Sequence, residues 1–237
     1  MNPGRYSRQM PMLGGEGQAV LRQACIGVVG LGGLGSNAVT HLACAGVGRF
    51  VLVDGQYPEE SNLNRQFIHS LAPSGASKAE SAAAWVRVLN PDVEAVGVTG
   101  ELCQEGVRET LCRCDLLLDC LDNHVSRMSL NDLVLENEIP LVHAAAQEWF
   151  GHITTVLPGR TPCLRCILPV SDEPTPAVIG STTGVLGSLQ ASEAIKLLVG
   201  KGHTLTGRLL TLDLYRNEFQ VLPIHASPDC PSCGGHV

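Results

Sequence analysis

The sequence lacks long runs of a single kind of residue, and it carries little charge. Charged residues make up 16% of the chain, where 16 Lys and Arg stand against 23 Asp and Glu. Because there is no long basic run, a nucleic-acid partner is not expected. No run of about 18 apolar residues occurs, so we expect no membrane-spanning segment. Residues 1–10 also lack the apolar stretch of a signal peptide, which favours a cytoplasmic protein.

Ten cysteines are many for a chain of 237 residues. In a small secreted protein this number would indicate disulfides. This chain is larger, and with 44% hydrophobic residues it can build a sizeable core. We therefore expect one domain, residues 1–237, with mostly reduced thiols, some of which bind a metal.

One glycine-rich stretch organises the rest of the chain. Residues 25–29 are apolar and predict a buried strand, which runs into the pattern Gly30-x-Gly32-x-x-Gly35 before a helix-like segment. Gly30 permits a tight turn, Gly32 lets the backbone approach a phosphate, and Gly35 lets the helix pack on the strand. The next strand ends at Asp54, at a distance that suits hydrogen bonds to ribose hydroxyls. The pattern predicts nucleotide binding; the alternative is a glycine-rich turn that only packs a helix on a sheet.

The first part of the chain alternates between expected strands and expected helices. The strands cover residues 25–29, 50–54, 93–98, 115–120 and 141–146, and the helices cover residues 36–45, 77–89, 105–112 and 126–138. This alternation predicts an α/β fold with a Rossmann-like, doubly wound, mostly parallel sheet.

The two ends of the chain follow other patterns. Residues 1–23 are an expected N-terminal arm with a short helix at 18–23, and residues 24–146 are the expected nucleotide-binding core. Residues 147–237 are an expected β-rich extension. Its expected parts are a crossover loop at 167–183, a helix at 184–199 and a hairpin of strands at 208–214 and 218–222.

Cys163-x-x-Cys166 and Cys230-x-x-Cys233 are two identical cysteine pairs. Each pair can present two thiolates to one ion, and two pairs give the closed tetrahedral site that suits structural Zn²⁺. A redox dithiol is the alternative, but it would need only one pair, and no helix is expected directly after Cys163. We expect a zinc clamp that ties the C-terminus to the segment before the crossover loop. The other six cysteines stand mostly in apolar runs, so we expect them to be buried.

Polar and charged residues follow two of the expected strands. Residues 61–67 follow one strand and Asp122 follows another, which places both where ligands bind in open α/β sheets. Lys78 lies in the first turn of an expected helix, where the helix dipole disfavours a cation, and this hints at an anionic ligand. The alternatives are an ordinary surface lysine and, for Arg8 in the N-terminal arm, a solvated surface charge.

Several motifs occur in order along nearly the whole chain, together with the two cysteine pairs. They are Arg5-Tyr-Ser-Arg8-Gln9, Gly30-Leu-Gly-Gly-Leu-Gly35, Ser61-Asn62-Leu-Asn64-Arg65-Gln66, Ser77-Lys78, Leu89-Asn90-Pro91, Asp119-Cys-Leu-Asp122-Asn123 and Gly187-Ser-Leu-Gln190-Ala-x-Glu193-Ala-Ile-Lys196. As a set they resemble the MoeB/ThiF/HesA family, which is related to the ubiquitin-activating enzymes.

This resemblance implies a function. Members of the family bind ATP and Mg²⁺ and adenylate the C-terminal glycine of a small ubiquitin-like sulfur carrier that ends in Gly-Gly. The activated carboxyl group then accepts sulfur and becomes a thiocarboxylate, which is used in molybdopterin or thiamine synthesis. The resemblance further implies a homodimer, and a separate sulfur donor protein because no rhodanese domain follows.

The resemblance also implies roles for individual residues. Asp54 would hold the ribose, and Asp122 would bind Mg²⁺. Arg8 would reach into the site of the neighbouring subunit. Asn62, Arg65 and Lys78 would surround the triphosphate. The remaining expected nucleotide contacts are Gly30, Gly32, Gly33, Leu34, Gly35, Gln66 and Leu121.

The sequence departs from the family's pattern in two places. Gln56 stands where members often have a second acid, and the 167–183 loop is short and contains no cysteine. The second departure leaves the identity of the carrier and the route of sulfur open. Two other functions also remain open. One is an NAD(P)-dependent oxidoreductase, which the glycine pattern alone would suit, and the other is a non-catalytic scaffold that binds a ubiquitin-like protein.

Overall fold

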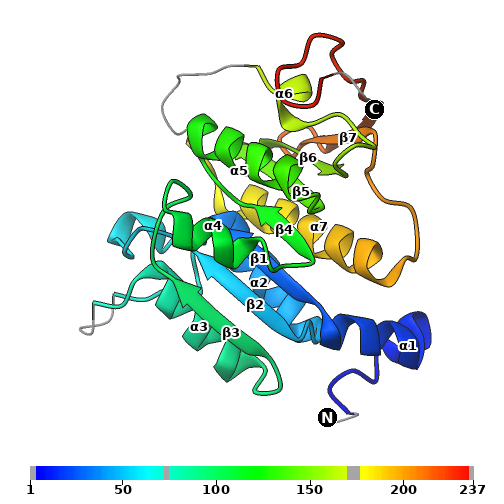
Figure 1. Ribbon diagram of the computed structural model, residues 1–237. Helices are drawn as coiled ribbons and strands as arrows, with labels where there is room; N and C mark the ends of the chain where they lie inside the picture. The colour runs from blue at the N-terminus through cyan, green and yellow to red at the C-terminus, as the bar shows by residue number, and fades with distance from the viewer. Residues whose placement is uncertain (1–3, 72–74, 170–176, 235–237) are drawn as a thin grey trace.

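A computed structural model describes residues 4–71, 75–169 and 177–234, and it contains a single eight-stranded sheet (Figure 1). The strands lie in the order β3-β2-β1-β4-β5-β6-β7-β8. Their bounds are β1 Cys25–Val29, β2 Arg49–Val53, β3 Glu94–Val98, β4 Leu116–Asp119, β5 Leu141–Gln147, β6 Phe150–Val156, β7 Arg208–Asp213 and β8 Glu218–Pro223.

Helices cover both faces of the parallel part of the sheet. They are α1 Met10–Gln23, α2 Gly33–Ala45, α3 Lys78–Leu89, α4 Glu105–Leu111, α5 His124–Glu136, α6 Leu164–Ile167 and α7 Gly180–Val199, with a 3₁₀ turn, η1, at Glu60–Asn62. Apolar residues of α2, α3 and α7 pack in one cluster, and those of α4 and α5 pack in a second cluster (Figure 1). Within β4, Leu116 and Leu118 face the first cluster and Leu117 faces the second, as the alternation of a strand requires.

The predicted fold class is confirmed. Strands β1 to β5 pair in parallel, and β5 to β8 pair antiparallel, so the β-rich extension continues the same sheet. The strand order reverses direction between β1 and β4. In open α/β sheets ligands bind at the carboxyl ends of the strands beside such a reversal. The glycine-rich stretch lies at this position, directly after the last residue of β1.

Local chemistry explains where several elements begin and end. The hydroxyl of Ser77 accepts a hydrogen bond from the Glu80 N–H, and the Glu80 carboxylate accepts one from the Ser77 N–H, a capping box that starts α3. Gly46 ends α2 with φ of +83°, a conformation that glycine adopts without strain.

The wrong predictions include the start of two helices and the absence of a helix after Cys163. Helix α1 begins at Met10 rather than at residue 18, with a break at Gly14, where φ is +73°. Helix α7 begins at Gly180, so the predicted 167–183 loop is too long at its C-terminal end; residues 170–176 of that loop lie outside the described residues. A short helix, α6, does follow Cys163 directly. Among the described residues no helix has the length and apolar character that crossing a membrane requires.

Candidate functional site

The glycine turn after β1 is fixed by close packing at two of its glycines. Gly30 has φ of +91°, and a Cβ atom there would lie 2.6 Å from the Cys120 carbonyl oxygen. A Cβ at Gly35 would lie 2.2 Å from the Gly30 carbonyl oxygen. A Cβ at Gly32, by contrast, would meet only the Gln66 amide, at an ordinary 3.5 Å. The protein itself therefore leaves room for a side chain at Gly32. The absence of a side chain there would instead let a ligand approach the backbone.

The carboxylate of Asp54 links the glycine turn to the segment that follows β2. It accepts hydrogen bonds from the backbone N–H groups of Leu31 and Gln56, both at 2.8 Å. An ionised carboxylate has about four acceptor positions, so two remain for other donors. The predicted ribose contact is compatible with this geometry. Leu34 is buried in the core, so only its backbone could face a nucleotide.

Lys78 is buried beside the same turn, at the first position of α3. Its side chain donates to the Gln56 amide oxygen at 2.8 Å, and the residue is only 3% exposed. No ion pair in the described part of the chain includes Lys78. A buried cation without a carboxylate partner is costly, so its presence indicates an anionic ligand. The alternative of an ordinary surface lysine is therefore wrong.

Two buried side-chain oxygens near the turn have no partner among the described residues. They are Oε1 of Gln66 and Oγ of Ser36, in residues that are 4% and 0% exposed. Gln66 faces Gly32, and Ser36 lies in the first turn of α2. Unsatisfied buried polar atoms are rare in folded proteins, and these two lie where the sequence predicts a nucleotide.

The segment after β2 brings two more predicted residues to this edge. Asn62 is buried and accepts a hydrogen bond from the Glu59 N–H at 3.2 Å, which caps η1. Arg65 is half-buried as a residue, and its guanidinium donates to Ser61 O and Asn64 Oδ1, so its present contacts are local. No ion pair among the described residues includes Arg65, which leaves its charge free for an anion.

His69 contributes to the site and was missed in the sequence. Its Nε2–H donates to the Leu31 carbonyl at 2.7 Å, and Nδ1 lies 3.1 Å from the Ser81 hydroxyl. Burial lowers its pKa, so the ring is neutral and Nδ1 accepts from Ser81. His69 thereby ties the glycine turn to α3, a contact that no local sequence pattern could indicate.

The loop after β4 forms the other side of the site. A Cβ at Gly30 would lie 3.1 Å from the Leu121 nitrogen, so Leu121 stands directly beside the glycine turn. The next residue, Asp122, is exposed, as its predicted role in binding an ion requires. Asp119 at the end of β4 is completely buried and was not predicted as a site residue.

Arg8 lies far from this edge within its own chain. The neighbouring Tyr6 packs against Gly46 at the C-terminal end of α2, and its hydroxyl accepts a hydrogen bond from Asn90 at 2.9 Å. The turn lies at the other end of α2, and the 13 residues of this helix span about 20 Å. Figure 1 shows α1 beside the starting ends of β1 and β2. Arg8 itself is exposed and makes no hydrogen bond or ion pair with the described residues.

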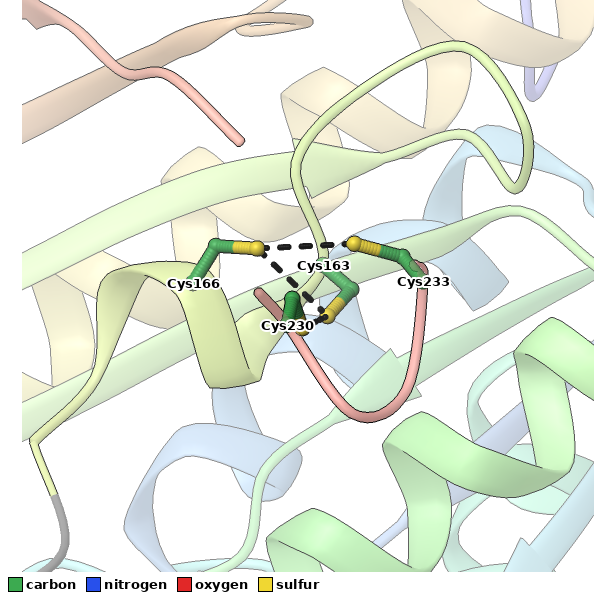
Figure 2. Close-up of side chains that lie close together, drawn as sticks. All are labelled: Cys163, Cys166, Cys230 and Cys233. Atoms are coloured by element: carbon green, nitrogen blue, oxygen red, sulfur yellow. Dashed lines mark hydrogen bonds between the residues drawn. The ribbon is translucent and has the colours of Figure 1, made fainter. Parts of the chain in front are cut away.

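The four cysteines of the two pairs come together in one cluster (Figure 2). All four sulfur atoms lie within 4.8 Å of one another. The separations are 4.0 Å for Cys163–Cys166, 3.6 Å for Cys163–Cys230 and 3.5 Å for Cys166–Cys233. A tetrahedral zinc site with bonds of about 2.3 Å places its sulfurs about 3.8 Å apart, so the cluster could hold a metal of this kind.

Helix α5 anchors both cysteine loops. The Asn131 side chain accepts a hydrogen bond from the Leu164 N–H at 2.8 Å. The Asp132 carboxylate accepts from Arg165 at 2.8 Å and from the Ser232 hydroxyl at 2.9 Å. The same helix therefore begins two residues after Asp122 and contacts both cysteine loops through Asn131 and Asp132 in its second half.

The remaining cysteines are less uniformly buried than predicted. Cys114 and Cys120 are buried, whereas Cys44 and Cys103 are exposed. Cys120, the cysteine nearest to Asp122 in sequence, donates to the Gln190 side chain at 3.4 Å. Burial raises the pKa of its thiol, so Cys120 is not a reactive thiolate.

Comparison with known proteins decides the family. Residues 6–232 match the sequence model of the ThiF family. The chain belongs to the ThiF family. It is 43% identical over 239 residues to SAMP-activating enzyme E1 from Haloferax volcanii, which covers 97% of this chain and 88% of that protein. It is 37% identical over 235 residues to protein HesA, heterocyst, from Trichormus variabilis, with the same coverage.

A further relative in the ThiF family is longer than this chain. Adenylyltransferase and sulfurtransferase MOCS3 from Bos taurus is 41% identical over 243 residues, but this chain spans only 53% of it. Membership beside such adenylyltransferases confirms the predicted enzyme class, a nucleotidyltransferase, and removes the oxidoreductase alternative. Among solved structures, E. coli MccB with ATP has a TM-score of 0.87 at 20% identity, covering 97% of this chain and 73% of that one. This likeness shows a shared fold alone.

Proposed function

We propose that the chain uses ATP to adenylate the C-terminal glycine of a small ubiquitin-like sulfur carrier ending in Gly-Gly. The product is an acyl-adenylate that a separate sulfur donor protein converts to a thiocarboxylate, for molybdopterin, thiamine or a related pathway. The names of two relatives, SAMP-activating enzyme E1 and adenylyltransferase and sulfurtransferase MOCS3, support this reaction.

The observation that carries the proposal is the buried charge of Lys78. It stands beside the glycine turn with an amide as its only side-chain acceptor among the described residues. Unpaired atoms on Gln66 and Ser36 lie near the same turn. An anion with further hydrogen-bonding groups, such as a nucleoside triphosphate, would satisfy all three.

The reaction explains why the site holds cations, and it needs no general base. The attacking group is a carboxylate, which is already ionised at neutral pH, and it attacks the α-phosphate while pyrophosphate leaves. Both reactants are anions, so the protein's task is to position them and to offset the growing charge. Lys78 and Arg65 would neutralise the phosphates, and Asp54 would orient the ribose.

The chain would also hold two kinds of metal ion. Asp122 would hold Mg²⁺, which supplies additional neutralisation of the phosphates when bound. Cys163, Cys166, Cys230 and Cys233 would hold Zn²⁺ as a structural clamp, since a site with four thiolates has no open position for chemistry. In this arrangement residues 24–146 bind the nucleotide, and residues 147–237 carry the clamp.

The position of Arg8 supports a homodimer with shared sites. Arg8 is exposed at the end of α2 opposite to the glycine turn, so it cannot serve the site of its own chain. In a twofold dimer the arm of residues 1–23 could place Arg8 at the site of the partner subunit.

Carrier-dependent ATP–pyrophosphate exchange tests the proposed function. The chain is incubated with ATP, Mg²⁺, labelled pyrophosphate and each member of a panel of Gly-Gly-ending carriers. We expect exchange with at least one carrier and none with that carrier lacking its last glycine. Absence of exchange with every carrier, in protein whose melting temperature rises with ATP and Mg²⁺, would favour the non-catalytic scaffold instead.

A further inference from the structure

The backbone of Leu121, the residue before Asp122, is held through both its N–H and its carbonyl. The Leu121 N–H donates to Asp119 Oδ1 at 3.0 Å, and the Leu121 carbonyl accepts from the Arg127 guanidinium at 2.6 Å. Both backbone polar groups of Leu121 are therefore fixed by side chains. A loop that needed only to connect β4 to α5 could leave these groups to water.

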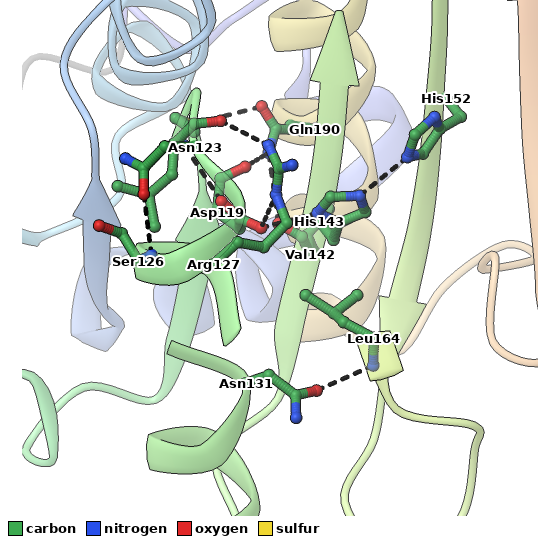
Figure 3. Close-up of polar contacts among 12 residues, drawn as sticks. Asp119, Asn123, Ser126, Arg127, Asn131, Val142, His143, His152, Leu164 and Gln190 are labelled. Carbon is green, nitrogen blue, oxygen red and sulfur yellow. Dashed lines mark hydrogen bonds and ion pairs between the residues drawn. The ribbon is translucent and has the colours of Figure 1, made fainter. Parts of the chain in front are cut away.

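Asp119 and Arg127 also form an ion pair with each other. Arg127 Nε lies 3.1 Å from Asp119 Oδ2, and the two side chains are 12% and 0% exposed. Arg127 thus uses two arms of its planar fork on two targets, the carboxylate that ends β4 and the carbonyl two residues later (Figure 3). A planar guanidinium fixes the relative position of two acceptors in a way that a lysine cannot.

His143, backed by His152, contacts the same carboxylate oxygen of Asp119 as Arg127 does. His143 Nδ1–H donates to Asp119 Oδ2 at 2.7 Å, and His143 Nε2 lies 3.0 Å from His152 Nε2 (Figure 3). Burial lowers the pKa of both rings, that of His152 to about 3, so both are neutral and His152 donates to His143. Burial acts to raise the pKa of Asp119, but the Arg127 charge and the His143 hydrogen bond hold it below its usual value.

Stability alone does not account for this arrangement. Burying an ion pair costs several kcal/mol of desolvation, and apolar residues of similar size often serve as well. Here both members of the pair bind the backbone of Leu121, which lies between the glycine turn and Asp122.

We propose that Asp119 and Arg127, backed by His143, are positioning residues that fix the Leu121 peptide and thereby aim the Asp122 carboxylate at the nucleotide-bound Mg²⁺. The proposal rests on the proposed function for its chemistry, and on the contacts of Leu121 for its geometry. Neither residue touches the reacting atoms.

The test compares three single variants. Arg127→Met removes both contacts of the guanidinium, and Arg127→Lys keeps the charge but cannot span both acceptors. Arg108→Met is the matched control, because Arg108 also pairs a guanidinium with a carboxylate at α5, to Glu136 at 2.9 Å, away from the β4–α5 loop. Each is examined as the full chain, with melting temperatures recorded.

Two readouts are used. The first is hydrogen–deuterium exchange of the free protein, where we expect faster exchange of the Leu121 amide in both Arg127 variants and no change in the control. The second is the Mg²⁺ concentration for half-maximal pyrophosphate exchange, which we expect to rise about 10- to 100-fold in Arg127→Met, as when an outer partner of a metal ligand is lost. Arg127→Lys should lie between Arg127→Met and the wild type.

Unchanged Leu121 exchange together with an unchanged Mg²⁺ requirement in folded Arg127→Met would overturn the inference. A lower rate with no change in the Mg²⁺ requirement would also overturn it, since it would indicate a general structural role. If the wild type shows no pyrophosphate exchange, the proposed function fails, while the hydrogen-exchange arm still decides whether the Leu121 peptide is clamped.

Discussion

At the scale of single residues, Lys78 shows what burial adds to sequence. The sequence places a lysine in the first turn of a helix, against the dipole, which points to an anion. The structure adds that Gln56, from the end of β2, covers it and leaves it 3% exposed. The burial of Lys78 depends on how two separate segments pack, so no local sequence pattern could predict it. The role of Lys78 in binding an anion stays a prediction, and its burial adds a physical reason for that prediction.

Replacing Lys78 or Asp122 should remove the reaction and leave the fold intact. We expect Lys78→Met and Asp122→Ala each to lower carrier-dependent pyrophosphate exchange by about 100-fold or more, as for the loss of a preorganised charge. Melting temperatures should not fall, because Asp122 is exposed and Lys78→Met removes an uncompensated buried charge while keeping its apolar stem.

The matched control for Lys78→Met is Lys201→Ala. The side chain of Lys201 also donates a hydrogen bond, to the Leu13 carbonyl at 3.0 Å. Lys201 is far in sequence from the glycine turn. It should keep full exchange activity. Near-normal exchange in both Lys78→Met and Asp122→Ala would contradict the assignment of the site.

Other residues of the site show which contacts the sequence could predict and which it could not. The glycines and Asp54 were predictable because their roles depend on neighbours within one strand–turn–helix unit. Asp119, His143 and His69 were missed, because their partners come from other strands and helices. Only the register of β4 beside β5 places His143 next to Asp119.

At the scale of helices and strands, buried apolar runs predicted well and glycine-rich ends did not. The strands β1, β2 and β4 and the helix α3 were found within a residue or two of prediction. Helix α7 starts four residues before prediction, in a segment containing Gly180 and Gly184, which are weak helix formers. Tertiary packing decides the outcome there, since a Cβ at Gly33 would meet the Thr183 side chain at 2.7 Å.

The cysteine cluster should make the stability of the C-terminal region depend on zinc. We expect one tightly bound zinc per chain, and a lower melting temperature when Cys163 or Cys233 is changed to serine, because metal binding is coupled to local folding. Cys44→Ser, at an exposed cysteine outside the cluster, is the control and should change neither value. Elemental analysis of freshly purified protein is the measurement, and protein without zinc would refute the expectation.

At the scale of the whole molecule, the direction of the parallel strands separates Arg8 from the glycine turn. The resemblance to a family could name Arg8, but only the fold shows that the N-terminal arm docks through Tyr6 at the opposite end of α2. The division into an arm, a core and an extension stays a prediction, as do the roles of each part.

Mixed dimers test whether Arg8 acts across an interface. Arg8→Ala and Lys78→Ala proteins should each be inactive alone. A heterodimer of the two should regain about half of the wild-type activity per dimer, because one of its two symmetric sites carries neither change. Activity is measured by pyrophosphate exchange after subunit exchange has been verified by native mass spectrometry. No recovery would contradict the assignment of Arg8 to the site of the partner subunit.

The most direct test of adenylation follows the α-phosphate of ATP onto the carrier. The chain, an exchange-competent carrier and Mg²⁺ are incubated with ATP labelled at either the α- or the γ-phosphate, and the carrier is isolated under acid. The account requires label from the α-phosphate on the carrier, and none from the γ-phosphate or on a carrier lacking its terminal glycine. Transfer of the γ-phosphate, or no α-label despite an intact site, would contradict it.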